Sequence, residues 1–322
     1  FTNLSEKEKG NYLTEKVGLN NTMNSFLYYY PLADKEFIAG NYDLQLLFKS
    51  MTLSGTKNMI SSLRESTDTL LRKIFEQWQL NKTILAKQYA LPITLRRLDL
   101  ASIEDQTENL EKELSLKSSS FENQQQSFQT KTTDVVKHLA RDESAIEFVR
   151  FKLVKNDRSD SIFYAAYILT TKDSAPVFVP LCEEKQLQKL FDSAGTTATA
   201  MVSKFYRGLE VKNKNTAGAL GTELYKLIWQ PLEPYLKGVK KVSYSPAGKL
   251  YSIAFHALPI DSATVLMDKY QLQQYTSTRQ VVLREQGKKN IIPQNITLFG
   301  DASFTLDSLQ IVKGKTKMEN VS

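Results

Sequence analysis

The chain has 322 residues, of which 41% are hydrophobic, and its 42 Lys and Arg against 35 Asp and Glu give a formal net charge of +7. That hydrophobic fraction supports a packed core and excludes a wholly disordered chain. One cysteine excludes an internal disulfide and a multi-cysteine zinc site, and two histidines exclude a three-histidine metal centre. At roughly 150 residues per domain, we expect about two folding units.

The sequence carries no signal for a membrane or for secretion. No stretch approaches the roughly 18 consecutive apolar residues that cross a bilayer. The opening FTNLSEKEKG lacks the basic and apolar regions of a secretory signal, and the absence of an initiator Met leaves room for sequence upstream. A single free thiol fits a reducing compartment, so we expect a cytoplasmic protein. Basic and acidic residues are interleaved, which favours a solvated surface over a nucleic-acid-binding face.

The first part of the chain, to about residue 140, has helical periodicity. Apolar residues three and four positions apart predict helices around 44–51 and over 58–79. Between 103 and 128 the apolar steps are seven and four residues, which predicts a helix that lies against another as a hairpin. No 34-residue helical repeat is evident. We therefore expect residues 1–143 to be a helical arm or linker region.

From about Ser144 the pattern changes to strands that alternate with helices. The stretches 144–154, 162–171 and 177–181 are rich in β-branched, aromatic and other apolar residues, and the second reads as a strand buried on both faces. Helical spacing returns at 183–192 and 216–236. The remaining predicted strands are 239–243, 249–255, 270–275 and 295–299. This alternation predicts an α/β sandwich with a partly parallel sheet.

A Cys–His pair in this chain has to use Cys182 with His138 or His256. His256 ends a predicted strand, where it suits either a general base or a half-exposed residue that closes a sheet edge, and we favour the second. His138 follows Lys137 at the end of a predicted helix and reads as a surface residue. Cys182 precedes two glutamates, which disfavour a thiolate, so we favour a packed hydrophobic role for it.

Three further residues resemble parts of functional motifs. Gly218 and Gly221, in TAGALGTE, resemble part of a phosphate-binding loop, but no Lys-Ser/Thr follows them, so the start of a helix is the favoured interpretation. Asp301 follows a predicted strand, where α/β proteins often place functional groups, and it has no carboxylate partner in the pattern. No serine lies in a G-x-S-x-G elbow. We assign no catalytic, cofactor-binding or metal-binding residue to the chain.

Residues 239–283 resemble the opening of a CHAT domain, the caspase-like cysteine peptidase domain usually found downstream of tetratricopeptide repeats in bacteria. The family pattern is a strand, a Ser-Pro-x-Gly turn, a strand ending in Ala-Phe-x-x-Leu-Pro, a tyrosine-bearing strand and a serine-containing turn. The 98–128 helix, the 144–154 strand, VFVPL and the helix ending at Trp229 also resemble the segment that precedes this core. The matching residues are Ser245-Pro246-Ala247-Gly248, Ala254-Phe255-His256-Ala257-Leu258-Pro259, Tyr270 and Ser277.

The resemblance implies an N-terminal helical region followed by the first part of a caspase-like α/β sheet sandwich, with residues 144–322 as the N-terminal portion of the CHAT domain. In the family, the catalytic His-Gly and Ala-Cys motifs follow the strand that corresponds to 295–300, and this sequence contains neither. The chain is then the non-catalytic N-terminal part of a cysteine endopeptidase whose His/Cys dyad lies beyond Ser322. The alternative is a non-enzymatic protein-interaction module, a catalytically dead CHAT relative.

The same resemblance implies partners. The parent protein would act on a protein or peptide substrate and carry a tetratricopeptide region upstream. The polar ending GKTKMENVS would suit a disordered end, an artificial boundary or a proteolytic nick, and in the last case a second chain completes the peptidase fold. We expect no nucleic acid, membrane, metal or cofactor among the partners.

Overall fold

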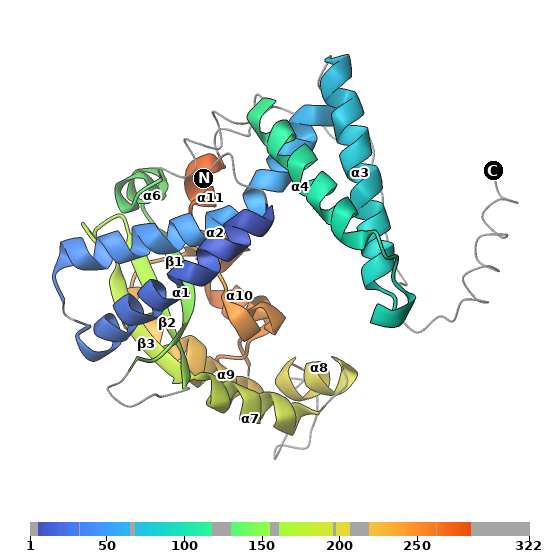
Figure 1. The fold of residues 1–322 in the computed structure, drawn as a ribbon. Coiled ribbons are helices and arrows are strands. Elements are labelled where there is room, and N and C mark those ends of the chain that lie inside the picture. The colour runs from blue at the N-terminus through green and yellow to red at the C-terminus, as the bar shows by residue number, and fades with distance from the viewer. Residues whose placement is uncertain are drawn as a thin grey trace, which may run out of the picture. The chain divides into compact units, whose positions relative to one another are not determined.

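The computed structural model describes residues 6–31, 33–64, 68–117, 130–154, 161–195, 198–206, 219–261 and 263–284, all within the first of two units, 1–286 and 287–322 (Figure 1). In the described part, no helix is both long and apolar enough to cross a membrane. The longer helices are α1 (Glu6–Tyr29), α2 (Lys35–Arg64), α3 (Thr69–Tyr89), α4 (Leu100–Lys117), α6 (Thr132–His138), α7 (Glu184–Ala194), α8 (Ala198–Tyr206) and α9 (Ala219–Ile228). Shorter helical turns are η1 (Ile93–Leu95), η2 (Gln230–Tyr235), η3 (Gly248–Ser252), η4 (Phe255–Ala257), α10 (Leu266–Lys269) and α11 (Gln280–Leu283).

A five-stranded mixed sheet with the order β3-β2-β1-β4-β5 forms the centre of the fold. The first three strands, β1 (Glu143–Lys152), β2 (Ile162–Thr170) and β3 (Val177–Glu183), pair antiparallel. The other two, β4 (Lys241–Ser245) and β5 (Gln271–Gln274), run parallel to each other, and β4 also runs parallel to β1. The prediction of an α/β arrangement with a partly parallel sheet is therefore confirmed.

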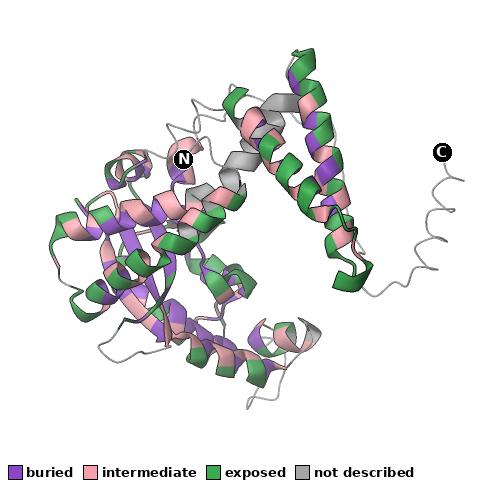
Figure 2. Cartoon of the chain, viewed as in Figure 1, coloured by how far each residue is buried: buried purple, intermediate pink, exposed green. Residues whose placement is uncertain are grey.

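One face of the sheet carries the larger hydrophobic core. On β1, Ile146 and Phe148 point to this face, where they belong to the same buried cluster as Leu187 of α7 and Leu224 and Ile228 of α9. The strands are largely purple in Figure 2 and the helices are green on their outer sides, as expected for a sheet covered by amphipathic helices.

The opposite face of the sheet is covered by helices from the N-terminal half. Val149 and Phe151 of β1 belong to a second buried cluster with Leu27 of α1, Tyr42 of α2 and Val135 of α6. Side chains alternate between the two faces along a strand, so β1 contributes buried residues to both cores. The N-terminal helices α1 and α2 are thus part of a three-layer sandwich.

The predicted helical stretch over 58–79 is confirmed, but it is divided between two helices. Helix α2 ends at Arg64 and α3 begins at Thr69. Asp68 is the N-cap of α3, and its carboxylate accepts the backbone N–H groups of Leu70 (2.9 Å) and Leu71 (3.2 Å). Such a cap satisfies N–H groups that have no partner inside the helix. The apolar spacing continues through both helices and so does not reveal the break.

The predicted helical hairpin is confirmed by α3 and α4, which form their own small core. Leu71, Phe75 and Trp78 of α3 are buried with Leu114 of α4. The rings of Phe75 and Trp78 stack with their centroids 5.8 Å apart. The part of the predicted helix beyond Lys117 lies outside the described residues.

The predicted strand over 249–255 is also wrong, since this segment forms the helical turns η3 and η4. Gly248 opens the segment with a φ of +51°, a conformation that redirects the chain after β4 and favours glycine. The N–H of Lys249 then donates to the hydroxyl of Tyr164 at 3.0 Å. Leu250 and Phe255 are fully buried in the larger core. Leu250 and Phe255 are therefore buried by compact helical turns. The spacing of apolar residues in the sequence is the same for such turns as for a short strand.

Candidate functional site at the carboxyl ends of β4 and β5

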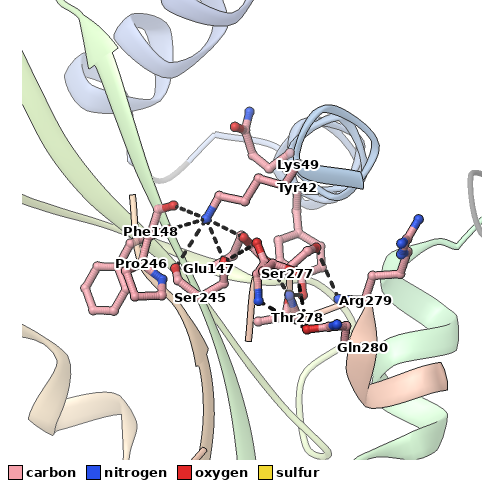
Figure 3. A network of polar contacts seen from close by, with 12 residues as sticks. Tyr42, Lys49, Glu147, Phe148, Ser245, Pro246, Ser277, Thr278, Arg279 and Gln280 are labelled. Atoms are coloured by element: carbon pink, nitrogen blue, oxygen red, sulfur yellow. Dashed lines mark hydrogen bonds and ion pairs between the residues drawn. The ribbon is translucent and has the colours of Figure 1, made fainter. Parts of the chain in front are cut away.

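The parallel strands β4 and β5 end at the same edge of the sheet, at Ser245 and Gln274. In open α/β sheets, ligands and reacting groups gather beyond the carboxyl ends of the strands. A buried polar cluster lies at this edge, with side chains that converge from α2, β1, the end of β4 and the turn after β5 (Figure 3). We call it the strand-end cluster; its members are Tyr42, Lys49, Glu147, Ser245, Ser277, Thr278 and Arg279.

An ion pair between Lys49 and Glu147 forms the centre of the cluster. The Glu147 side chain is fully buried, and its Oε1 atom lies 2.6 Å from Nζ of Lys49. The ammonium also donates to the carbonyl oxygens of Phe148 (2.8 Å) and Pro246 (3.0 Å) and to Oγ of Ser245 (2.8 Å). An ammonium has three N–H donors, so these acceptors share them with the carboxylate. Lys49 therefore joins α2 to β1 and to the carboxyl end of β4.

The second oxygen of Glu147 holds the turn that follows β5. Oε2 accepts the backbone N–H of Thr278 at 2.7 Å and also the hydroxyl of Thr278. The Tyr42 hydroxyl lies 2.6 Å from the same threonine oxygen. Because the one hydroxyl proton of Thr278 goes to the carboxylate, Tyr42 is the donor in this contact. Oγ of Ser245 donates to the carbonyl of Thr276 at 2.9 Å, which ties the turn to β4 as well.

Burial shifts the pKa of three groups around Glu147, namely those of Lys49, Tyr42 and Arg279. Burial lowers the pKa of Lys49, and the nearby Glu147 charge opposes that shift. Burial also raises the pKa of Tyr42 well above its usual value. The pKa of Arg279 falls to about 10 through burial, again against the pull of Glu147. The carboxylate thus stabilises two buried cations, and its removal leaves their desolvation uncompensated.

A second buried glutamate, Glu143, holds the other end of the same segment. Its carboxylate accepts from both terminal nitrogens of Arg284 (2.6 and 2.8 Å) and from Oγ of Ser243 (2.6 Å). Burial works against its ionisation, but the bonds from Arg284, the N–H of Ala140 and Ser243 together lower the pKa of Glu143 to about 2. Arg284 also donates to the carbonyl of His138 at 2.6 Å, which links α11 to α6.

The two glutamates act together on the segment between β5 and the end of α11. Glu143 and Glu147 are four residues apart on β1 and therefore lie on the same face of the sheet. Glu147 binds Thr278 at the start of this segment and Glu143 binds Arg284 at its end. The strand-end cluster contains no histidine or cysteine, and the Glu147 carboxylate is already bonded, so its chemistry is to fix the backbone of the turn.

The structure does not bring the predicted candidates Cys182 and His256 together. Cys182 lies on β3, where burial raises the pKa of its thiol to about 12. His256 lies in η4, and its Nε2 donates to the carbonyl of Leu272 on β5 at 3.1 Å. Strands β3 and β5 are the opposite edges of the sheet, about 19 Å apart at roughly 4.8 Å per strand. That separation is far beyond hydrogen-bond reach.

His138 is not a partner for Cys182 either. It ends α6, and its Nδ1 donates to the carbonyl of Asp134 at 2.8 Å. Helix α6 packs on the face of the sheet that carries the second cluster, whereas Cys182 belongs to the larger core on the opposite face.

Gly221 has a packing role on α9. A Cβ atom at Gly221 would lie 2.2 Å from the carbonyl oxygen of Phe205 and 2.7 Å from Cγ of Pro259, so only glycine fits. This close approach explains the glycine without a phosphate. The other two motif candidates, Gly218 and Asp301, lie outside the described residues. In the part of the chain that the structure describes, no three His, Cys, Asp or Glu residues are grouped to hold a metal ion.

The residues that carried the family resemblance lie in the core and at the strand-end edge. Ser245 ends β4 and belongs to the strand-end cluster, as does the buried Ser277. Phe255 is buried against Trp229, with ring centroids 5.8 Å apart. Tyr270 is buried, and its hydroxyl donates to Glu233 at 2.8 Å.

The sequence analysis did not identify four charged residues of this region: Lys49, Glu143, Glu147 and Arg284. One signal was available, because Glu147 interrupts the apolar run SAIEFVRF, as a buried charge on a strand would.

Comparison with known proteins agrees with these motifs. Residues 218–319 match the family model of the CHAT domain. No curated protein and no solved structure matches the chain. The match spans η2, β4, the Ser-Pro-x-Gly turn, β5 and the turn after β5, so it includes Ser245 and Thr278 of the strand-end cluster but not α2 or β1, which supply its ion pair. The resemblance expected from the motifs is confirmed over residues 218–319, which are similar to the CHAT domain.

Proposed function

We propose that this chain supplies the helical arm and the first strands of a CHAT-type cysteine endopeptidase, whose catalytic His and Cys lie in sequence beyond Ser322. The family match over residues 218–319 carries this proposal. In such an enzyme, a thiolate attacks the peptide carbonyl, the histidine serves as base, and backbone N–H groups stabilise the oxyanion. In this proposal neither the cysteine nor the histidines of this chain are the catalytic groups.

The state of Cys182 and the two histidines supports the proposal. The sequence has one cysteine and two histidines, and each of the three is committed to packing or to a backbone contact. With a pKa of about 12, the Cys182 thiol is almost wholly protonated at neutral pH. A cysteine nucleophile requires the thiolate, so catalysis of this class needs another cysteine.

The strand-end cluster gives this chain a positioning role in the same proposal. It secures the carboxyl end of β4 and the turn after β5, at the edge where α/β proteins present their reacting groups. Catalytic groups have to be held to within fractions of an ångström, and buried hydrogen-bonded shells provide that rigidity. Lys49 and Glu147 are then positioning residues that act through the Thr278 turn.

The remaining parts of the proposal concern organisation and partners. We propose residues 1–143 as the helical arm and 144–322 as the N-terminal portion of the CHAT domain. The substrate would be a protein or peptide, a tetratricopeptide region would precede the chain, and a second chain would complete the fold if the protein is nicked. The lone thiol supports a cytoplasmic location.

A non-enzymatic interaction module is the second candidate, and one feature of the described structure favours it. A pocket of about 690 Å³ lies at the turn between α1 and α2, lined by Phe26, Tyr29, Tyr30 and Phe37. Tyr30 is 62% exposed, and exposed aromatic side chains are enriched in protein interfaces. A catalytically inactive CHAT relative would use such a surface for binding.

The two candidates are separated by labelling the natural protein, including the sequence that follows Ser322, with a thiol-directed peptidyl probe. Intact mass and peptide mapping would locate the label. The peptidase proposal expects a label on a cysteine beyond Ser322, and the same label in the Cys182→Ala variant. Label confined to Cys182 would overturn it. No label, together with no His-Gly and Ala-Cys motifs in the continuation, would support the interaction module.

A further inference from the structure

A small pocket lies where β1 and β4 begin. The strand-end cluster lies at the other end of these two strands. Its volume is about 190 Å³. Three loops meet around it: the residues before β1, the turn between β2 and β3, and the turn after η2. Arg141, Lys172 and Lys237 each line the pocket, one from each of these loops.

These three cations have no ionic partner among the described residues. Within the described residues, the side chain of Arg141, Lys172 or Lys237 forms no ion pair and no hydrogen bond. Some other cations of the fold are paired; Nε of Arg150, for example, lies 2.6 Å from Oε2 of Glu184. Three unpaired cations around one concave site create a positive potential, which attracts an anion.

The two carboxylates that line the pocket do not cancel this charge. Glu143 is bonded to Arg284 and lies 3.6 Å from Nζ of Lys241, so two cations outside the set of three already face it. Asp173 accepts the N–H (3.2 Å) and hydroxyl (2.6 Å) of Thr170 within its own turn. Asp173 is therefore the one lining carboxylate left to balance the three cations, and one of its oxygens already accepts two hydrogen bonds within the turn.

From this arrangement we infer that the pocket binds a single phosphate-like oxyanion, either free or carried as a phosphoryl group on another molecule. A guanidinium and two ammonium groups are the donors that proteins use for phosphate. Pockets for whole drug-sized ligands have volumes of about 300–1,000 Å³, so this one suits a group of a few atoms. Gly238, which has a φ of +81°, also lines the pocket, and the space beside its Cα is open.

Titration calorimetry on the full chain tests the inference, with inorganic phosphate and O-phosphoserine as probes and chloride added to keep the ionic strength constant. The expected result is saturable binding of at least one probe. Tighter binding of O-phosphoserine would identify a carried phosphoryl group, and tighter binding of inorganic phosphate a free anion. The Arg141→Gln/Lys172→Gln/Lys237→Gln variant should bind at least about tenfold more weakly, since each charge-assisted hydrogen bond contributes to affinity.

The matched control is Arg72→Gln/Lys87→Gln/Lys226→Gln, which removes the same charge from exposed positions that do not line the pocket. It should bind the probe like the unchanged protein. Absence of binding by the unchanged protein, or equal weakening in both triple variants, would overturn the inference. Circular dichroism checks that the triple variants fold, and the single Lys237→Gln variant, at an exposed turn, repeats the test with one charge.

Discussion

Nζ of Lys49 on α2 lies 2.6 Å from Oε1 of Glu147 on β1, and the other carboxylate oxygen binds Thr278 beyond β5. One buried carboxylate thereby connects the N-terminal helices, the centre of the sheet and the turn at its carboxyl edge. The helical half and the α/β half of the chain are joined here by charge as well as by hydrophobic packing.

Replacing Glu147 with glutamine should destabilise the protein strongly. The substitution keeps the shape but leaves Lys49 buried without its counter-charge, and losing one partner of a buried pair costs about 3–5 kcal/mol. Urea unfolding measures the free energy of unfolding. Glu223→Gln on the exposed side of α9 is the control and should change it by less than about 0.5 kcal/mol. A small loss in Glu147→Gln would show that the pair is not important for stability.

Replacing both partners separates lost charge from lost packing. The Lys49→Met/Glu147→Leu variant should recover much of the stability lost in Glu147→Gln, because apolar residues of similar volume need no desolvation of charge. The Glu147→Leu change removes the acceptor of the Thr278 N–H, whereas Glu147→Gln keeps one amide oxygen, so hydrogen exchange at this turn should rise most in the double variant. A double variant less stable than the single one would contradict this account.

Stability should fall as the pH drops below about 5, with a measurable part of the loss due to Glu143. Its pKa is lowered in the folded protein from 4.5 to about 2, so its contribution is present at neutral pH and disappears as the pH falls from about 5 to 2. A shift of that size corresponds to about 3 kcal/mol. In Glu143→Gln, the free energy of unfolding should depend less steeply on pH in this window. Parallel curves for the two proteins would assign the pH dependence to other groups.

Cys182 should be unreactive in the folded protein. It is 3% exposed and its pKa is raised to about 12 by burial, so both access and thiolate are lacking. Maleimide labelling followed by intact mass should show no adduct in native buffer and one adduct in guanidinium chloride. Ser174→Cys, at an exposed position in the turn between β2 and β3, should label at once and serves as the control. Rapid native labelling of Cys182 would contradict its placement.

Two glycine substitutions should change stability in opposite directions. Gly221→Ala places a methyl group against the Phe205 carbonyl and Pro259, where overpacking costs about 1–3 kcal/mol. Gly40→Ala lies in α2 with no atom near the new Cβ, so it should stabilise the protein by up to about 1 kcal/mol. Thermal unfolding of both variants measures the difference. Equal effects would show that the close approach at Gly221 is relieved at no cost.

Local sequence patterns predicted most of the sheet but not the turns around it. Strand β2 was expected over 162–171 and forms Ile162–Thr170, because a short run of apolar, aromatic and β-branched residues is typical of a buried strand. The turns after Gly248 were predicted as a strand because burial of Leu250 and Phe255 gives the same apolar signal in a compact turn. The break at Asp68 was missed because apolar spacing continues across it.

By itself, the sequence determined the class of the fold, the similarity of residues 218–319 to the CHAT domain and the exclusion of multi-cysteine and three-histidine metal centres. These follow from composition, periodicity and contiguous motifs, which are local properties of a chain. Only the tertiary structure decided that Lys49, Glu147 and Thr278 share one buried site, and that Cys182 and His256 lie at opposite edges of the sheet. The reason is physical: hydrogen bonds and ion pairs depend on distances of a few ångströms between residues far apart in sequence, and strand order sets those distances.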